Sequence, residues 1–237
     1  MNKAYLNWSS GKDATLALFF LQQNRDIKIE KLVTTLDSTS SRISMHGLRK
    51  ELLFQQCQNL QLPLHIIDLP GDVPLMEYNI IMRKETSTLL MQGFTHSVFG
   101  DIFLEDLRRY REEQLSKMGI KAIFPLWKMD TSELIQRFIK EGFKAITVSV
   151  NAKSLDKSFC GRIIDKQFLE ELPDNVDPCG ENGEFHTFVF DGPLFQNPVK
   201  FLKGDIYSDI KKLENESQKI QKKTWDTNFW YCDLIPK

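Results

Sequence analysis

The segment LNWSSGKDATLAL, residues 6–18, decides the fold. A short apolar strand ends at a turn of small, hydroxylated residues, Trp8 to Ala14, and a helix is predicted to begin near Asp13. Because such a turn aims several backbone N–H groups and the positive end of a helix dipole at one point, it is typical of a phosphate site. An N-capped amphipathic helix behind a small turn explains the same residues, so the turn alone leaves both interpretations open.

The spacing within this turn excludes the common phosphate loop of nucleotide-binding proteins. That loop needs a glycine separated by four residues from its Gly-Lys pair and a Ser or Thr after the Lys, whereas Asp13 follows Lys12 here. The turn instead resembles S-G-G-x-D-S, the pyrophosphate loop of enzymes that cleave ATP between its α and β phosphates. Ser10 replaces a Gly and Ala14 replaces the last Ser, so Ser10 must adopt backbone angles that suit glycine.

Apolar strands and helices alternate along residues 1–150. No hairpin signal interrupts them, so the pattern predicts an α/β fold, a mostly parallel sheet with helices on both faces and right-handed crossovers. Ligands of such sheets bind at the carboxyl ends of the strands, where the SSGKD turn, Asp37 and the pair Gly100-Asp101 fall. After the first strand, the predicted strands are 29–36, 64–69, 95–99, 121–124 and 144–150, and the predicted helices are 15–23, 45–59, 77–91, 104–118 and 132–141.

The alternation ends near Asn151, and we expect a division of the chain there. Residues 1–150 are predicted to form the ATP-binding domain, and residues 151–237 a smaller C-terminal substrate lobe and tail. The GEN turn of this lobe is expected to reach back to the sheet. The aromatic segment 225–236 is expected to be a final strand, docked on the body or on a second subunit of a homodimer, and the mixed-charge segment 211–223 favours a solvated helix or loop.

The composition is that of a nearly neutral chain. It has 31 basic and 32 acidic residues and a pI near 6.4, which gives no electrostatic footprint for nucleic acid or for an anionic membrane. The N-terminus runs directly into a strand, and no apolar run reaches the roughly 18 residues of a membrane span, so we expect a soluble, cytoplasmic protein. The four cysteines have no C-x-x-C spacing, which indicates neither a zinc site nor a disulfide framework.

Further blocks extend the resemblance over roughly residues 3–200, and the block around GENGEF is far more specific than the turn. Together they resemble the diphthine–ammonia ligase family of adenine-nucleotide α-hydrolase-like proteins. The resemblance implies a HUP-type, Rossmann-like fold and an ATP-dependent reaction. In that reaction the carboxylate of diphthine, a modified histidine of elongation factor two, is adenylated, and ammonia then displaces AMP to give an amide. The blocks are WSSGKDA (8–14), SMH (44–46), GDIFLEDLRRYR (100–111), FPLW (124–127) and CGENGEFHTFVFDGPLF (179–195).

The resemblance assigns roles to the first turn. Ser9, Ser10 and Gly11 would bind pyrophosphate through backbone N–H groups and hydroxyls. Lys12 would add positive charge, and Asp13 would hold Mg²⁺ directly or through water. We expect Lys12 and Asp13 both to be catalytic, and Asp13 to be the metal ligand.

Two further blocks supply candidates near the nucleotide and the substrate. His46, Gly100 and Asp101 are expected to neighbour the nucleotide, although His46 is equally explained as a histidine at a helix start that faces solvent. Arg108 and Arg111 are three residues apart on a predicted helix and can share a face that clamps phosphate or carboxylate; surface salt bridges are the alternative.

The GENGEF block carries two carboxylates, Glu181 and Glu184, in a Gly-rich turn. They repel each other unless a cation, a metal or a hydrogen-bonded substrate lies between them, and we expect both to be catalytic. Asn182 replaces a family Gly and His186 replaces a family Glu, and we expect both to contact the substrate. The change from Glu to His186 removes a negative charge, which weakens a site for the trimethylammonium group of diphthine. The sequence GENGEFHTF also resembles bacterial-type members of the family. We therefore expect a different acyl substrate.

Three functions remain open from the sequence. The first is an ATP-dependent ligase that joins a small or protein-borne carboxylate to ammonia, with ATP and Mg²⁺ required. The second is an ATP-binding regulatory module without turnover, which the losses at Ser10 and Ala14 favour. The third is ATP-dependent thiolation with Cys160 or Cys179 as the sulfur carrier, although no paired cysteine motif accompanies them.

Overall fold

The computed structural model describes residues 1–38, 42–43, 47–71, 73–208 and 228–237. Two predictions therefore lie outside the described residues, the one for His46 and the one for the segment 211–223. Within the described residues, no helix is long and apolar enough to cross a membrane.

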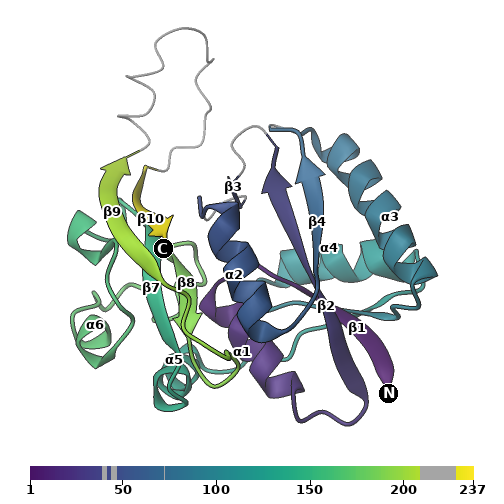
Figure 1. Ribbon diagram of the computed structural model, residues 1–237, viewed down its shortest axis with the longest axis horizontal. Coiled ribbons are helices and arrows are strands. Elements are labelled where there is room, and N and C mark those ends of the chain that lie inside the picture. The colour runs from purple at the N-terminus through teal and green to yellow at the C-terminus, as the bar shows by residue number, and fades with distance from the viewer. Residues whose placement is uncertain (39–41, 44–46, 72, 209–227) are drawn as a thin grey trace, which may run out of the picture.

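The first sheet confirms the predicted α/β fold (Figure 1). Its parallel strands lie in the order β4-β2-β1-β5-β6, and the short β3 pairs antiparallel with the end of β2. The chain builds outward from β1 through β2 to β4 and then returns to the other side of β1, so the strand order reverses between β1 and β5. Ligands of Rossmann-like sheets bind at this reversal. The strands are β1 Asn2–Asn7, β2 Ile27–Asp37, β3 Arg42–Ile43, β4 Leu64–Leu69, β5 His96–Val98 and β6 Lys121–Ile123.

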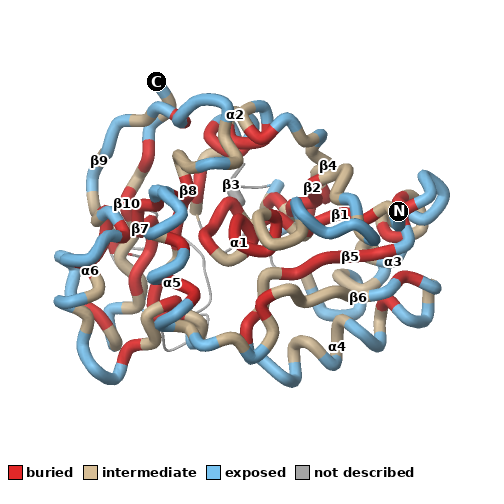
Figure 2. The backbone as a smooth tube through the Cα atoms, turned by 90° about the horizontal axis from the view of Figure 1, so that it is seen from below, coloured by how far each residue is buried: buried red, intermediate tan, exposed pale blue. Residues whose placement is uncertain are grey.

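Helices cover both faces of this sheet because its strands are apolar on both sides. Tyr5 and Val33 contribute to the core under α3 and α4, whereas Leu6 and Leu32 contribute to the core under α1 and α2. Figure 2 shows that the backbone of α1 and β5 is largely buried. The helices are α1 Lys12–Leu21, α2 Lys50–Leu60, α3 Leu75–Met91, α4 Glu105–Ser116, α5 Thr131–Lys140 and α6 Lys166–Glu170, with a 3₁₀ turn at Lys157–Phe159.

A second, antiparallel sheet forms the smaller lobe, with the order β8-β7-β10-β9. The placement of 144–150 as the last strand of the parallel sheet was wrong, because β7 pairs only with later segments. A strand that is buried on both faces gives the same apolar pattern in either sheet. The prediction that the final strand docks on the body is confirmed, since β10 lies between β7 and β9. The strands are β7 Lys144–Asn151, β8 Phe185–Asp191, β9 Phe201–Ser208 and β10 Phe229–Pro236.

The two lobes share one hydrophobic core. Leu16 of α1 and Leu52 of α2 belong to the same buried cluster as Val150 of β7 and Phe188 of β8. The division of the chain between residues 150 and 151 stays a prediction. The second sheet begins earlier in the sequence, because β7 is one of its strands. The turn after β1 lies against the outer edge of β8, where the N–H of Val189 donates to the carbonyl of Ser10 at 3.0 Å.

Candidate functional site

A cavity of about 430 Å³ lies at the carboxyl edge of the parallel sheet, between the strands and helices α3 and α4. Its deeper wall is apolar, with Val33, Ile67 and Leu89 among the residues that form it. Its mouth is polar and is formed by strand ends, by α4 and by the GEN turn. The polar residues there include Asn7, Ser9, Asp13, Asp101, Arg111 and Glu181. This arrangement suits a ligand with a flat apolar part and a charged tail.

The predicted phosphate loop connects β1 to α1. Ser10 has φ +69°, which confirms that it occupies a backbone conformation suited to glycine. Gly11 is the N-cap of α1 and is extended, with no side-chain cap. The first-turn N–H groups of Asp13 and Ala14 therefore have no intrahelical acceptor, and both residues line the cavity. They are available to bind an anion.

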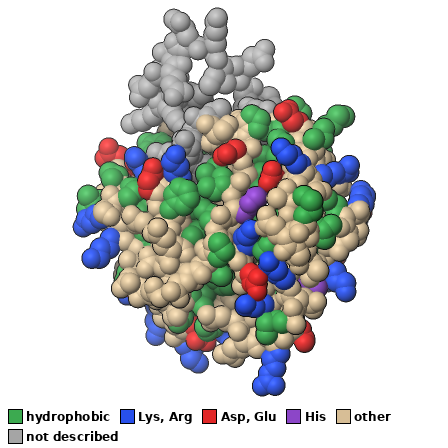
Figure 3. Space-filling model, turned by 45° about the vertical axis from the view of Figure 1, so that its right-hand side comes forward, with side chains coloured by type: hydrophobic (Ala, Val, Ile, Leu, Met, Phe, Trp, Pro, Cys, Tyr) green, Lys and Arg blue, Asp and Glu red, His purple; other side chains and the backbone are tan. Residues whose placement is uncertain are grey.

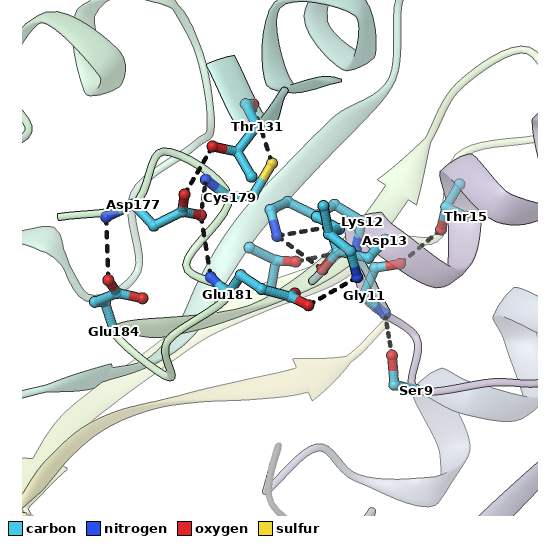
Figure 4. Close-up of polar contacts among 12 residues, drawn as sticks. Ser9, Gly11, Lys12, Asp13, Thr15, Thr131, Asp177, Cys179, Glu181 and Glu184 are labelled. Atoms are coloured by element: carbon cyan, nitrogen blue, oxygen red, sulfur yellow. Dashed lines mark hydrogen bonds and ion pairs between the residues drawn. The ribbon is translucent and has the colours of Figure 1, made fainter. Parts of the chain in front are cut away.

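Lys12 is buried and does not line the cavity, and Figure 4 shows its side chain beside Asp13, which does. Its Nζ lies 2.9 and 2.8 Å from the two carboxylate oxygens of Asp13. Burial works to lower the pKa of Lys12, but the negative charge and hydrogen bonds of Asp13 outweigh it and raise the pKa. The backbone N–H of Lys12 donates to Oγ1 of Thr187 at 3.1 Å, so this N–H belongs to the contact with β8.

The GEN turn is closed by carboxylates of its own. Asp177 Oδ1 accepts the N–H groups of Cys179 and Glu181, at 2.9 and 3.2 Å. Glu184 is buried, and its carboxylate accepts the N–H groups of Asp177 and Asn182, at 3.0 and 2.9 Å. The Asn182 side chain also donates to Glu184, at 3.2 Å. Glu184 and Asn182 therefore hold the turn together, and neither lines the cavity.

Glu181 points from this turn into the cavity mouth (Figure 4). Its Oε1 accepts the backbone N–H of Ile102 at 2.8 Å, which fastens the smaller lobe to the loop after β5. Burial raises the pKa of Glu181 to about 7, and the negative charge of Asp13 adds to the effect, although Lys12 and the Ile102 N–H oppose it. Near neutral pH this carboxyl can both hold and release a proton.

Asp101 and Arg111 form an ion pair at the cavity mouth. Burial raises the pKa of Asp101, and the charge of Arg111 opposes this shift. Arg108 does not share this position. It donates to Glu112 at 2.8 Å, and its guanidinium lies 4.5 Å from the ring centroid of Trp127. The pair of arginines predicted to act as one clamp is thus divided, and only Arg111 reaches the cavity.

Gly100 brings β5 against the first turn of α1. A Cβ at this position would lie 2.8 Å from the backbone N of Ala14 and 2.8 Å from the backbone C of Asp13. Only glycine allows this approach without displacing backbone atoms.

His186 lies on β8 and does not line the cavity. Burial lowers its pKa to about 4, and the positive charge of Lys12 acts in the same direction. Its ring stacks on Phe229 of β10, with 6.3 Å between centroids. A neutral imidazole in this place supplies no negative charge.

The sequence analysis gave no role to two residues that hold the phosphate loop. Gln56 is fully buried and bonds to Ser10, and Thr187 accepts the N–H of Lys12. The signal for Gln56 was a lone polar residue on the apolar face of a predicted helix, beside Leu52, Leu53 and Leu60. Buried amides need partners, so such a position indicates a contact even when the partner is unknown.

The buried thiols do not favour thiolation. Burial raises the pKa of Cys179, and its Sγ donates to the carbonyl of Thr131 at 3.2 Å. Burial likewise raises the pKa of Cys160 to about 12, and its Sγ donates to the carbonyl of Trp230 at 3.4 Å. Sulfur carriers react as thiolates, which these surroundings disfavour.

Comparisons with known proteins were made for both sequence and structure. Residues 130–234 match the model of the Diphthamide synthase C-terminal domain. The diphthine–ammonia ligase of Schizosaccharomyces pombe is 29% identical over 181 residues, which cover 71% of this chain and 29% of the relative. The Bos taurus enzyme of the same name is 33% identical over 102 residues, which cover 40% and 38%. The Homo sapiens enzyme is 31% identical over the same length and the same shares.

The matched region spans only about three to four tenths of the length of these relatives. Among solved structures, the U34-tRNA thiolase NcsA from Methanococcus maripaludis with its [4Fe-4S] cluster has a TM-score of 0.37 and 16% identity, covering 58% of this chain and 55% of that chain. The fold assignment rests on the strand order described above. Taken with the domain match, the sequence similarities support the predicted resemblance to the diphthine–ammonia ligase family.

Proposed function

We propose that this protein is an ATP-dependent ligase that activates a carboxylate as an acyl-adenylate and joins it to ammonia. One observation carries the proposal: the turn after β1 and Glu181 of the smaller lobe meet at a single cavity. The cavity lies where a Rossmann-like sheet binds nucleotides, and a carboxyl group with a pKa near 7 stands at its mouth.

ATP fits this cavity by its chemistry. The apolar wall accepts the base, and the free first-turn N–H groups of Asp13 and Ala14 suit the pyrophosphate end. The described residues contain no group of three or more His, Cys, Asp or Glu side chains that could hold a metal ion. A Mg²⁺ ion would therefore arrive on the triphosphate, and Asp13 would add one carboxylate ligand.

The reaction has two displacements. A carboxylate oxygen of the substrate attacks the α-phosphorus, the bond to the β-phosphate breaks, and pyrophosphate leaves with the electron pair. The nitrogen of ammonia then attacks the acyl carbon, and the bond to the AMP oxygen breaks. The nitrogen loses one proton in forming the amide, and the Glu181 carboxylate is placed to accept it. Lys12, paired with Asp13 at 2.8 Å, would supply positive charge beside the loop.

The substrate would enter beside Arg111, which lines the cavity together with Arg83. The relatives' printed name implies diphthine as the acyl substrate, and the neutral His186 in place of a glutamate favours a different acid here. Nucleic acid is not expected as a partner of this nearly neutral chain. Figure 3 shows basic and acidic side chains interspersed on the face in view.

The test is product analysis with purified protein. Incubation with ATP, Mg²⁺, ammonia and a pool of carboxylic acids should release AMP and pyrophosphate together, in an amount that depends on the acid. Release of ADP, or no release with any acid, contradicts the proposal. Tight ATP binding by calorimetry without any turnover would favour the regulatory module instead.

A further inference from the structure

A buried amide side chain connects the phosphate loop to the smaller lobe. Gln56 of α2 has no exposed surface. Its Oε1 accepts the indole N–H of Trp8 at 2.7 Å, and its Nε2 donates to the carbonyls of Ser10 and Val189, at 3.1 and 2.7 Å. Every hydrogen of this amide is used, so Gln56 has one defined orientation. Its three partners come from the cavity wall, the phosphate loop and strand β8.

Strand β8 reinforces this junction from its outer edge. Val189 N–H donates to the carbonyl of Ser10 at 3.0 Å, and Thr187 Oγ1 accepts the N–H of Lys12 at 3.1 Å. The loop thus satisfies part of a sheet edge that would otherwise lack partners. The same strand begins at Phe185, directly after the turn that presents Glu181.

The conformation that this junction holds is an unfavourable one. Ser10 lies in the left-handed region, which costs a non-glycine residue roughly 1 kcal/mol or more. Its hydroxyl is buried and has no hydrogen-bond partner among the described residues. Within the loop, the N–H of Gly11 makes one long hydrogen bond to Oγ of Ser9, at 3.4 Å. The shorter bonds that hold Ser10 go to its own carbonyl and come from Gln56 and Val189, outside the loop.

We propose that Gln56 is a positioning residue for the nucleotide site. By holding the Ser10 peptide in the left-handed conformation, it keeps the first-turn N–H groups of α1 aimed into the cavity. Through Trp8 and Val189, Gln56 also connects the phosphate loop to β8, the strand that directly follows the GEN turn. The proposal rests on the proposed function, in that the anion of the loop is taken to be the phosphate chain of ATP.

The central variant is Gln56→Met, which keeps the length of the side chain but cannot donate. We expect the Kd for ATP, measured by calorimetry, to rise about tenfold or more, and the hydrogen-bonded amides of Lys12 and Val189 to exchange with solvent at least about tenfold faster. The added change Ser10→Gly should return both values to within about threefold of wild type, because glycine adopts positive φ without help. An unchanged Kd in Gln56→Met, or no rescue by Ser10→Gly, overturns the proposal.

Asn59→Ala is the matched control. Asn59 lies on the same helix and also joins the lobes, since its Oδ1 accepts the N–H of Asn197 at 3.1 Å, away from the loop. This variant should lower the melting temperature without changing the Kd for ATP. Should it raise the Kd as much as Gln56→Met does, Gln56 acts only through general stability and the proposal fails.

Two further arms keep the test decisive. If Gln56→Met does not fold, Thr187→Val removes the other bond from β8 to the loop, and a Kd that stays unchanged overturns the proposal while a rise of about threefold to tenfold supports it. If wild type binds no ATP, the proposed function fails, and the amide-exchange comparison alone decides the role of Gln56.

Discussion

The two turns that meet at the cavity are built in opposite ways. The GEN turn, residues 177–184, is closed by its own carboxylates, since Asp177 and Glu184 accept the backbone N–H groups that surround them. The phosphate loop has no side-chain cap, and its conformation depends on residues far away in the sequence, Gln56 and Val189. A self-closed turn is sensitive to changes within it, whereas an externally held loop is sensitive to changes elsewhere. Four predictions follow from this difference.

The largest effect is expected from opening the self-closed turn. Glu184→Ala leaves the N–H groups of Asp177 and Asn182 without the buried carboxylate that accepts them, so the free energy of unfolding should fall by about 2–4 kcal/mol. Urea titration measures this loss. Glu170→Ala, at an exposed position on α6, serves as the control and should change it by less than about 0.5 kcal/mol. Equal losses in the two variants would show that Glu184 does not close the turn.

The second-largest effect is expected on catalysis, in a variant that leaves the GEN turn closed. Glu181→Gln keeps an oxygen that can accept the Ile102 N–H but cannot take up a proton. The kcat for AMP release should fall about 100-fold, with little change in the KM for ATP. Steady-state kinetics decide this, with Glu105→Gln at the exposed start of α4 as the control. A rise in the KM for ATP with an unchanged kcat would assign Glu181 to ATP binding instead of catalysis.

The pH dependence of stability sharpens the account of the same residue. The pKa of Glu181 rises from its ordinary value of 4.5 to about 7 in the folded protein. Between these values the folded state binds more protons than the unfolded state, so Glu181 makes the protein lose stability as the pH rises through this window. The free energy of unfolding of wild type minus that of Glu181→Gln should therefore decrease from pH 4.5 to pH 7. A constant difference would contradict the raised pKa.

The smallest effect is a gain in stability. Ser10→Gly removes the cost of positive φ and the unpaired hydroxyl, so the free energy of unfolding should rise by about 0.5–1 kcal/mol. Gln61→Gly is the matched control, because Gln61 also has positive φ, at the end of α2. The gain for Ser10 should exceed the gain for Gln61 by the contribution of the hydroxyl. Thermal unfolding of both variants measures the difference.

Local signals account for what the sequence predicted well. The order of strands and helices follows from hydrophobic periodicity, and the strain at Ser10 follows from comparing a serine with the glycine of a known loop. The placement of β7 failed because the partners of a buried strand are set by segments far along the chain, β8 and β10. No local pattern encodes that choice.

The directions in which individual side chains point could not be predicted from the sequence either. Glu184 sits three residues after Glu181, yet it turns inward to close the backbone while Glu181 faces the cavity. Arg108 is drawn to Glu112 and to Trp127, which lies beyond the helix in sequence. Helical spacing places residues on a face, but the neighbours that compete for a charged group come from the tertiary fold.

The absence of a side chain at Gly100 has a consequence for how the cavity mouth changes over evolution. Since even one carbon atom there would press on the backbone of Asp13 and Ala14, the end of β5 and the start of α1 form a seam of fixed width. A relative that carries alanine at this position must have spread the seam, and with it the mouth of the cavity. The identity of this one residue thus serves as a gauge of the mouth's width in any related chain.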